Sequence, residues 1–297
     1  GTLNIEDGAS VSATVVFIGG FTDGAATVTG AGSSLSSGST LYVGFLGTGT
    51  LNVEDGGSVS AINTTIGGFK DGTATVTGAG SSITGSSVLY VGFLGTGTLN
   101  VENGATASAP TTYIGGSASG TATITGTGSS LSSDTVYVGY LGAGTLNVTD
   151  GGSVSDTDGY LGSNGIAGTA TVSGTGSTWS NSASLHIDGG STLTVTDGGG
   201  VSSQDGYVGP NGLGGTATIS GTGSTWSNSA SLHIDGTGTL NVANGGSVSD
   251  TDGYLGSDGF ASSATISGTG STWSNSASLH IDGGSSLTVT DGGVVKV

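Results

Sequence analysis

An internal repeat fills the chain. The phrase Thr-Leu-Asn-Val and its variants place a leucine every 47 or 48 residues, at Leu3, Leu51, Leu99, Leu146, Leu193, Leu240 and Leu287. Units therefore begin near residues 1, 49, 97, 144, 191, 238 and 285 of the 297. Self-similarity at a fixed period indicates a solenoid, in which each unit buries its apolar side against the next. We predict a single repeat domain over residues 1–297.

Each unit also has a weaker inner symmetry, offset by 24–25 residues, that matches Leu3 with Val28 and Ile18 with Val43. Every half-unit contains three short strand signals, separated by Gly, Asn and Asp, which tolerate the positive φ of sharp corners. We therefore predict an all-β chain, a parallel β-helix of about 12 turns of about 24 residues, with three short strands per turn.

The alternation of strand side chains predicts inward and outward columns along the stacked turns. The first strand is expected to place thirteen apolar residues in one inward column: Leu3, Val28, Leu51, Val76, Leu99, Ile124, Leu146, Val172, Leu193, Ile219, Leu240, Ile266 and Leu287. Its flanking residues are expected to form outward columns of Thr and of Asn, Thr or Ser. The second strand carries Trp179 and Trp226 where earlier units have leucine or isoleucine, which favours core filling over exposed indoles that stack on sugars.

The third strand predicts an outward stripe of rings. It places an apolar column from Ile18 to Ile281 inside, and the residue before each member is nearly always aromatic or histidine. Ring faces can stack on sugars, so this stripe is the candidate ligand-binding surface. Beside Phe17, its members are Tyr42, Tyr90, Tyr113, Tyr137, Tyr160, His186, Tyr207, His233, Tyr254 and His280.

Charge excludes several classes of partner. The chain has 20 acidic residues against two basic ones, Lys70 and Lys296, for a net charge of −18. Nucleic acids and anionic membrane surfaces both need a basic footprint, so neither is an expected partner. No window is long and apolar enough to insert into a membrane. Cysteine is absent, which excludes disulfides and thiolate metal sites.

The stretch Gly-Ser-Thr-Trp-Ser-Asn-Ser-Ala-Ser-Leu-His-Ile-Asp-Gly occurs three times, at 176–189, 223–236 and 270–283. Within it, Ser184, His186 and Asp188 could share a strand face. Same-face neighbours lie about 6.7 Å apart, so Ser184 is expected to be too far from His186 for a nucleophile–base pair. We predict no catalytic residues and no metal site.

Acidic residues mostly precede glycine, as turn residues do: Asp7, Asp55, Asp150, Asp197 and Asp291. The Asp156-Thr-Asp158-Gly and Asp250-Thr-Asp252-Gly segments resemble parts of calcium loops but lack the remaining ligands. The expected cofactor is therefore none, with Ca²⁺ as an open alternative.

The repeated phrase Gly-Thr-Gly-Thr-Leu-Asn-Val-Glu-Asp-Gly-Gly-Ser-Val-Ser, together with Tyr-Val-Gly and Gly-Thr-Ala-Thr-Val-Thr-Gly-Ala-Gly-Ser-Ser, resembles the repeat of type V secretion autotransporters and PEP-CTERM-associated proteins. The resemblance covers essentially the whole chain. It implies a right-handed β-helix in an exported passenger of a Gram-negative envelope protein, so we expect a fragment of a longer, extracellular or surface-bound protein. It supplies no catalytic residues.

These features lead to several functional hypotheses. The first is a non-enzymatic stalk or adhesin segment, which contacts host-cell or matrix glycans or proteins through many repeated weak points. Ice binding by the outward Thr ladder, or glycan binding by the ring stripe, is an alternative. A further alternative is a fibre subunit that self-associates end to end along its axis.

Overall fold

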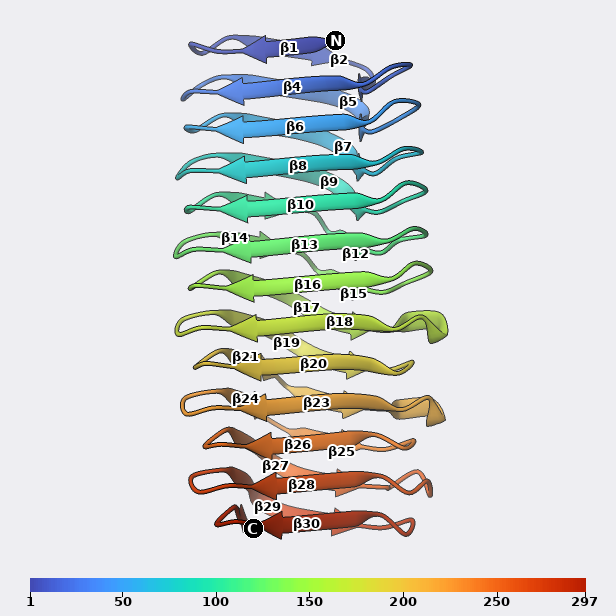
Figure 1. Cartoon of the computed structure of the whole chain (residues 1–297), viewed down its shortest axis with the longest axis vertical. Coiled ribbons are helices and arrows are strands. Elements are labelled where there is room, and N and C mark those ends of the chain that lie inside the picture. Colours follow the sequence, from blue (N-terminus) through green and yellow to red (C-terminus); the bar gives the residue numbers. More distant parts are fainter. The chain divides into compact units, whose positions relative to one another are not determined.

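A computed structural model describes residues 1–297, apart from the side chain of residue 211. The chain forms an all-β parallel solenoid of about 12 turns with two parallel sheets (Figure 1). It divides into two compact units: unit 1 comprises Gly1–Asn147 and Gly152–Ser155, and unit 2 comprises Val148–Gly151 and Asp156–Val297. Both units are built from the same kind of turn, and the single repeat domain stays a prediction.

The first strand of each turn belongs to the first sheet. In unit 1 these strands are β1 (Thr2–Ile5), β4 (Gly24–Thr29), β6 (Gly49–Glu54), β8 (Gly72–Thr77), β10 (Gly97–Glu102) and β13 (Gly120–Thr125). The unit boundary crosses β16 (Gly144–Thr149). In unit 2 they are β18 (Gly168–Ser173), β20 (Ser191–Thr196), β23 (Gly215–Ser220), β26 (Thr239–Ala243), β28 (Ser263–Ser267) and β30 (Ser286–Thr290).

The second and third strands of each turn belong to the second sheet. In unit 1 they are β2 (Ser10–Ala13), β3 (Val16–Ile18), β5 (Ser34–Val43), β7 (Ser58–Ile66), β9 (Ser82–Val91), β11 (Thr106–Ser108), β12 (Thr111–Ile114), β14 (Ser130–Ser132) and β15 (Thr135–Val138). The boundary crosses β17 (Ser153–Leu161). In unit 2 they are β19 (Thr178–Ile187), β21 (Gly200–Ser203), β22 (Asp205–Val208), β24 (Thr225–Asn228), β25 (Ser231–Ile234), β27 (Ser247–Leu255), β29 (Thr272–Ile281) and β31 (Val294–Lys296).

The predicted three strands per turn are separate in some turns and joined in others. Where β5, β7 and β9 run through the corner as single strands, the pairing register shifts at the bend, for example between Ser37 and Thr40. Two 3-10 helices, η1 (Ser163–Gly165) and η2 (Pro210–Gly212), interrupt loops of unit 2.

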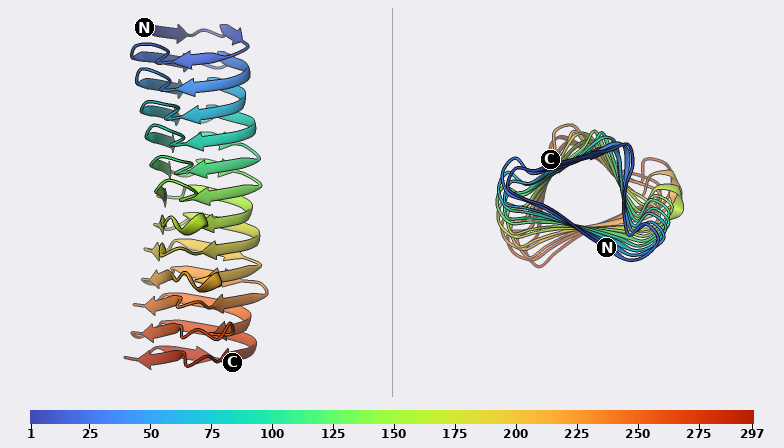
Figure 2. Two further views of the ribbon diagram at one scale, coloured as in Figure 1. Left: turned by 90° about the vertical axis from the view of Figure 1, so that its right-hand side faces the viewer. Right: turned by 90° about the horizontal axis from the view of Figure 1, so that it is seen from above.

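The winding is right-handed, as the resemblance implies. In Figure 1 the near strands, such as β4 and β6, run to the left, the chain returns behind them, and successive turns descend. Within each unit, consecutive turns lie one above the other in both side views (Figures 1 and 2). Every printed pairing between turns is parallel, for example between β10 and its two neighbours β8 and β13.

The inward face of the first sheet differs from the predicted single column. Leu99 pairs with Ala122 and Ala74, whereas Val101 pairs with Ile124 and Val76. The predicted match of Leu3 with Val28 is therefore wrong by two residues, because Leu3 pairs with Ala26 and Ile5 with Val28. The core has two inward columns here, one alternating leucine with alanine and one of valine and isoleucine, and their interior members are fully buried.

The same correction moves the outward columns. Thr98 lies between Thr73 and Thr121, and Asn100 lies between Thr75 and Thr123. The expectation that Thr and Asn, Thr or Ser face outwards on this sheet is confirmed, but the members of each column alternate differently from the prediction. The reason is that the turns alternate in length, with Gly97 paired 25 residues back to Gly72 and 23 residues forward to Gly120.

The other two predicted inward columns are confirmed. In the third strand Val91 pairs with Ile66 and Ile114, and all three side chains are fully buried. In the second strand all three tryptophans have no exposed surface, so core filling is the correct interpretation: Trp179, Trp226 and Trp273.

A column of buried serines connects the corners between the first and second strands. Ser129 Oγ accepts a hydrogen bond from the Gly104 amide at 2.9 Å, and Ser177 Oγ accepts one from the Gly151 amide at 3.0 Å. Both serines are fully buried. These hydroxyls satisfy corner amides of the neighbouring turn that the strands leave unpaired.

Candidate functional site

The predicted ring stripe exists as an ordered stack in unit 1. Tyr113 stacks on Tyr90 and Tyr137 with ring centroids 5.0 and 4.9 Å apart and nearly parallel planes. Phe17 stacks on Tyr42 in the same way at 5.3 Å. The in-register pairing of their strands holds each ring directly beside the ring of the next turn. Burial, followed by the three neighbouring tyrosines, raises the pKa of Tyr113.

In unit 2 the stripe alternates tyrosine and histidine. Five successive contacts join its six rings at centroid distances of 4.5–5.2 Å, with planes within 13° of parallel: Tyr160–His186, His186–Tyr207, Tyr207–His233, His233–Tyr254 and Tyr254–His280. Burial lowers the pKa of His186, an effect that nearby Asp158 partly opposes.

This stacking limits what the stripe can bind. The rings inside each stack have both faces against neighbouring rings, so only their edges and polar atoms remain for a ligand. Sugars stack on ring faces, and that mode requires faces that these rings use for each other. The ligand-binding role of the stripe stays a prediction, with hydrogen bonding by ring edges as the mode that the geometry permits.

A second line of apolar residues beside the stripe was missed from the sequence. The loops after the third strands of unit 1 place Phe45 against Tyr42 and Phe69, and Phe93 against Tyr90. The same loops expose apolar side chains over 47–89% of their surface: Phe21, Leu46, Phe69, Leu94 and Leu141. We call these five residues the loop ridge. The Gly-Phe-Leu-Gly segments at 44–47 and 92–95 were the available sequence signal.

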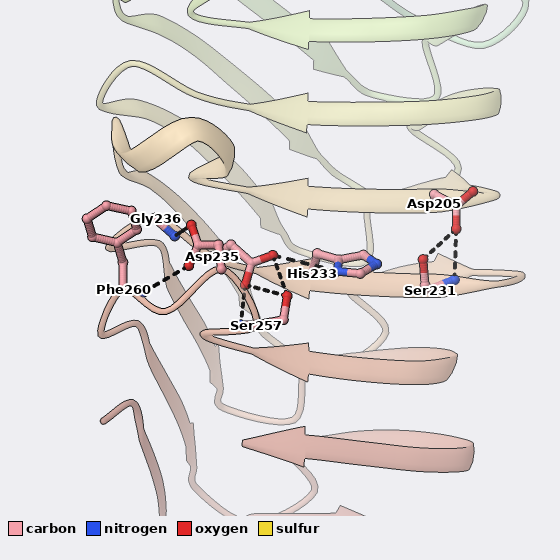
Figure 3. A network of polar contacts seen from close by, with 8 residues as sticks. Asp205, Ser231, His233, Asp235, Gly236, Ser257 and Phe260 are labelled. Atoms are coloured by element: carbon pink, nitrogen blue, oxygen red, sulfur yellow. Dashed lines mark hydrogen bonds and ion pairs between the residues drawn. The ribbon is translucent and has the colours of Figure 1, made fainter. Parts of the chain in front are cut away.

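The three Ser-His-Asp copies do not form a relay in the described contacts. Ser184, Ser231 and Ser278 each donate to an aspartate of the preceding turn, at 2.5 Å: Asp158, Asp205 and Asp252. His233 Nδ1 lies 3.6 Å from Asp235 Oδ2, but Asp235 also accepts hydrogen bonds from Ser257 (Figure 3).

Only the third copy brings a serine and its histidine together. Ser278 Oγ lies 3.1 Å from His280 Nε2, so the expected separation is wrong there, although Ser184 bonds to Asp158 as described. Among the described contacts, no histidine meets both the serine and the aspartate of its own copy. A nucleophile, base and orienting acid in one chain of hydrogen bonds are thus not assembled.

The predicted turn acids occupy turns. Asp7, Asp55, Asp150, Asp197 and Asp291 all have φ of 50–54°, in the left-handed region that asparagine and aspartate tolerate. Asn103 and Asn244 occupy the same kind of corner with the same φ. These carboxylates can therefore be exchanged for amides within the fold, which is typical of a structural role.

The segments resembling calcium loops separate their carboxylates. Asp156 is buried and accepts a hydrogen bond from the Trp179 indole at 2.7 Å, whereas Asp158 bonds to Ser184. Among the described residues, no group of three or more His, Cys, Asp or Glu side chains is arranged to hold a metal ion. Calcium binding stays an untested alternative.

The surface offers shallow hollows. Three of them, with volumes of about 400, 340 and 220 Å³, are lined by at most one acidic side chain each. Glycoside hydrolysis needs two facing carboxyl groups, so these hollows lack its machinery. Within the described residues, no helix has the length and apolar character required to cross a bilayer.

The fold and its columns define a class, the parallel β-solenoid with repeated outward faces, of the kind found in autotransporter passengers. No family model matches the chain, and no curated protein matches it. Among solved structures, a fragment of TibA, hyper-glycosylated in a reaction catalysed by TibC, is similar with a TM-score of 0.50. The identity is 18%, over 100% of this chain and 99% of the TibA fragment, and shows likeness of fold alone.

Proposed function

We propose that this chain is a non-enzymatic, adhesin-like segment of an exported surface protein. The observation that carries the proposal is the repetition of the same outward faces on successive turns, without a singular constellation of reactive groups among the described contacts. The fold likeness to the TibA fragment and the passenger-like repeat support an extracellular or cell-surface location. The mechanism is multivalent contact by many weak, equivalent points on a stiff scaffold.

The proposed contact surface is the side of the turns that carries the ring stripe and, in unit 1, the loop ridge. Contiguous exposed apolar side chains on a soluble protein mark interaction sites. The ridge contributes apolar contact, and the edges of Tyr113 and its neighbours contribute hydrogen bonds. A host-cell or matrix glycan or protein is the partner class that such a surface suits.

Glycan and matrix-protein arrays test this proposal. Wild type is compared with a Tyr113→Ala, Tyr137→Ala, Tyr160→Ala variant and with a Phe69→Ser, Leu94→Ser, Leu141→Ser variant of the loop ridge. A Thr73→Ala, Thr98→Ala, Thr121→Ala variant on the other sheet is the matched control, and circular dichroism checks that all are folded. We expect binding that either of the first two variants reduces and the control retains. Equal binding by all four, or none by wild type, contradicts the proposed surface.

Ice binding is a second candidate, favoured by the corrected Thr columns. Thr50, Thr73, Thr98 and Thr121 follow one another in register on the outer face of the first sheet. Their spacing is the regular separation of paired strands, about 4.8 Å. Thermal hysteresis that the Thr73→Ala, Thr98→Ala, Thr121→Ala variant abolishes would support this candidate, and ice growth unaffected by concentrated wild type would dismiss it.

End-to-end self-association also stays a proposal. Sedimentation velocity and electron microscopy of the full-length protein would reveal fibres that lengthen with concentration. Single particles of constant mass over a hundredfold range of concentration would contradict it. Catalysis is tested separately by screening acidic and neutral polysaccharides for release of new chain ends, which we expect to be absent.

A further inference from the structure

A row of buried polar side chains occupies the corner between the second and third strands of unit 2. It consists of equivalent residues from successive turns, each no more than 6% exposed: Asp156, Asn181, Ser203, Asn228, Asp250 and Asn275. Ser203 pairs with Asn228, and Asp250 with Asn275, in the register of the strands. We call this row the polar corner. Buried polar groups are normally hydrogen-bonded, so each member should have a partner.

Two tryptophans fix one carboxyl oxygen each. Trp179 Nε1 donates to Asp156 Oδ2, and Trp273 Nε1 donates to Asp250 Oδ2, both at 2.7 Å. The remaining oxygens, Asp156 Oδ1 and Asp250 Oδ1, are buried without a hydrogen-bond partner in the described part of the chain. So are the side-chain oxygens of the asparagines one turn further on, Asn181 and Asn275. All four are acceptors, and in each pair a donor is missing.

The middle copy shows what fills this gap. Ser203 stands at the position of the aspartates, and its hydroxyl donates to Asn228 Oδ1 at 2.6 Å. The indole of Trp226 donates to the same hydroxyl at 3.4 Å. A donor O–H at this position therefore satisfies the asparagine of the next turn. A carboxylic acid carries such an O–H only when it is protonated.

We propose that Asp156 and Asp250 are neutral carboxylic acids in the folded protein, each donating its proton to Asn181 or Asn275, so that unit 2 contains two proton-dependent latches between turns. One proton on each aspartate supplies the missing donor and satisfies both orphaned oxygens of its pair.

The surroundings favour the neutral form. Burial raises the pKa of Asp156 to about 7 and that of Asp250 to about 6, against the opposing effect of the indole hydrogen bonds. The charged neighbours on the same strands are Asp158 and Asp252, which also raise these pKa values. On the strands that follow, the titratable side chains are those of His186 in β19, His280 in β29 and exposed Lys296 in β31.

Asp250 has one further neighbour that Asp156 is not shown to have. The preceding turn places Asn228 in the polar corner, and its Nδ2 is a buried donor without a partner in the described residues. An amide donor stabilises an ionised carboxylate, so Asp250 should release its proton more readily than Asp156. The lower pKa of Asp250 agrees with this.

The sign of the pH dependence follows from the raised pKa. Between the unfolded pKa of 3.8 and the folded values, the folded state binds more protons than the unfolded state. Stability is therefore fully present below about pH 4 and is lost as the pH rises through 6 and 7. In that window the unfolding equilibrium constant of unit 2 rises by up to tenfold per pH unit for each latch.

Urea unfolding of the full chain between pH 4 and pH 8 tests the proposal, followed by tryptophan fluorescence because all three indoles lie in unit 2. We expect the urea midpoint of wild type to fall as the pH rises. The Asp156→Ser, Asp250→Ser variant copies Ser203 and should lose most of this fall, whereas Ser203→Asp should steepen it. Asp197→Asn, which copies the corner residue Asn244, is the control and should behave as wild type.

Infrared spectroscopy gives an independent measurement. A carbonyl band of neutral carboxylic acid should persist at pH 5.5 in wild type, where free aspartate is ionised, and should vanish in the Asp156→Ser, Asp250→Ser variant. A fall in midpoint that is identical in wild type and this variant, or the lack of a neutral-acid band in wild type, would overturn the proposal.

Discussion

At the residue scale, complementary volumes explain why the repeat has a long and a short period. Where the residue before a stripe ring is small, the next turn carries a large residue in its second strand, as with Thr112 and Leu131. In unit 2 the contrast is extreme, because glycine precedes the ring and tryptophan follows one turn later. A Cβ built on Gly206 would lie 2.7 Å from Trp226 Cζ2. The indole occupies the space that a side chain at this glycine would need.

Gly206→Ala should therefore destabilise unit 2 by about 1–3 kcal/mol through overpacking. The added methyl meets Trp226, Asn228 Oδ1 at 2.6 Å and Leu232 Cδ1 at 2.9 Å. Urea unfolding with m-value analysis measures the loss. Gly200→Ala in the neighbouring strand is the control, because its Cβ would meet only the Thr225 hydroxyl at 3.4 Å.

Replacing both partners tests the reason behind this loss. Gly206→Thr with Trp226→Leu copies the Thr112 and Leu131 pair and should be more stable than Gly206→Thr alone. If the double change is as damaging as the sum of the single ones, volume compensation is not the explanation.

At the element scale, the ring stripe is a source of stability whatever it binds. Stacked aromatic pairs contribute about 0.5–1.5 kcal/mol each beyond their buried area. Tyr113 contacts three rings, those of Tyr90, Tyr137 and Tyr140, whereas Tyr254 contacts two, His233 and His280. The stripe therefore reinforces the pairing of the third strands from one turn to the next.

Tyr113→Ala should consequently cost about 2–4 kcal/mol, more than Tyr254→Ala, since three ring contacts are lost. Chemical denaturation of each single variant measures the difference. Tyr113→Phe keeps the stacked ring and should remain close to wild type. A Tyr113→Ala variant as stable as wild type would show that the stack adds nothing to stability.

The buried serines connect turns by a different interaction. Ser177 Oγ accepts from the Gly151 amide and donates to the Ser173 carbonyl at 2.7 Å, with no exposed surface. Ser177→Ala leaves both buried backbone groups unsatisfied and should cost about 1–3 kcal/mol in thermal or urea unfolding. Ser180→Ala, on the exposed side of β19, should change stability by less than about 0.5 kcal/mol.

At the scale of the whole molecule, charge works against the fold. A net charge of −18 with only two basic residues leaves most carboxylates facing one another without compensating cations. Such self-repulsion destabilises the compact state while it favours solubility. Salt weakens interactions between exposed charges beyond about 10 Å at 0.1 M ionic strength.

Sodium chloride should therefore raise the melting temperature at neutral pH, with most of the gain between about 10 and 150 mM. The same addition at pH 4 should have a smaller effect, because many carboxylates are then neutral. Differential scanning calorimetry measures both. A melting temperature that is independent of salt at pH 7.5 would indicate that the carboxylates lie too far apart to repel one another.

Much of the fold could be predicted because the chain writes the same turn repeatedly. The glycine and aspartate corners, the buried column through Val91 and the outward stripe through Tyr113 all follow from local alternation and positive-φ residues. The binding surface was predicted less completely. The loop ridge was missed, since Leu94 lies in a corner without strand periodicity, and the stacking that covers the ring faces depends on how turns pair.

The sequence by itself determined the solenoid, the direction in which most side chains point and the residues that form the corners, because these depend on neighbours along the chain. Only the tertiary structure decided which residues of adjacent turns meet: Leu99 with Ala122 rather than with Ile124, Trp226 with Gly206, and Asp250 with Asn275. The reason is physical, since period-two alternation specifies a face but not a register. Register is selected by volumes and hydrogen bonds that close only when one turn lies on the next.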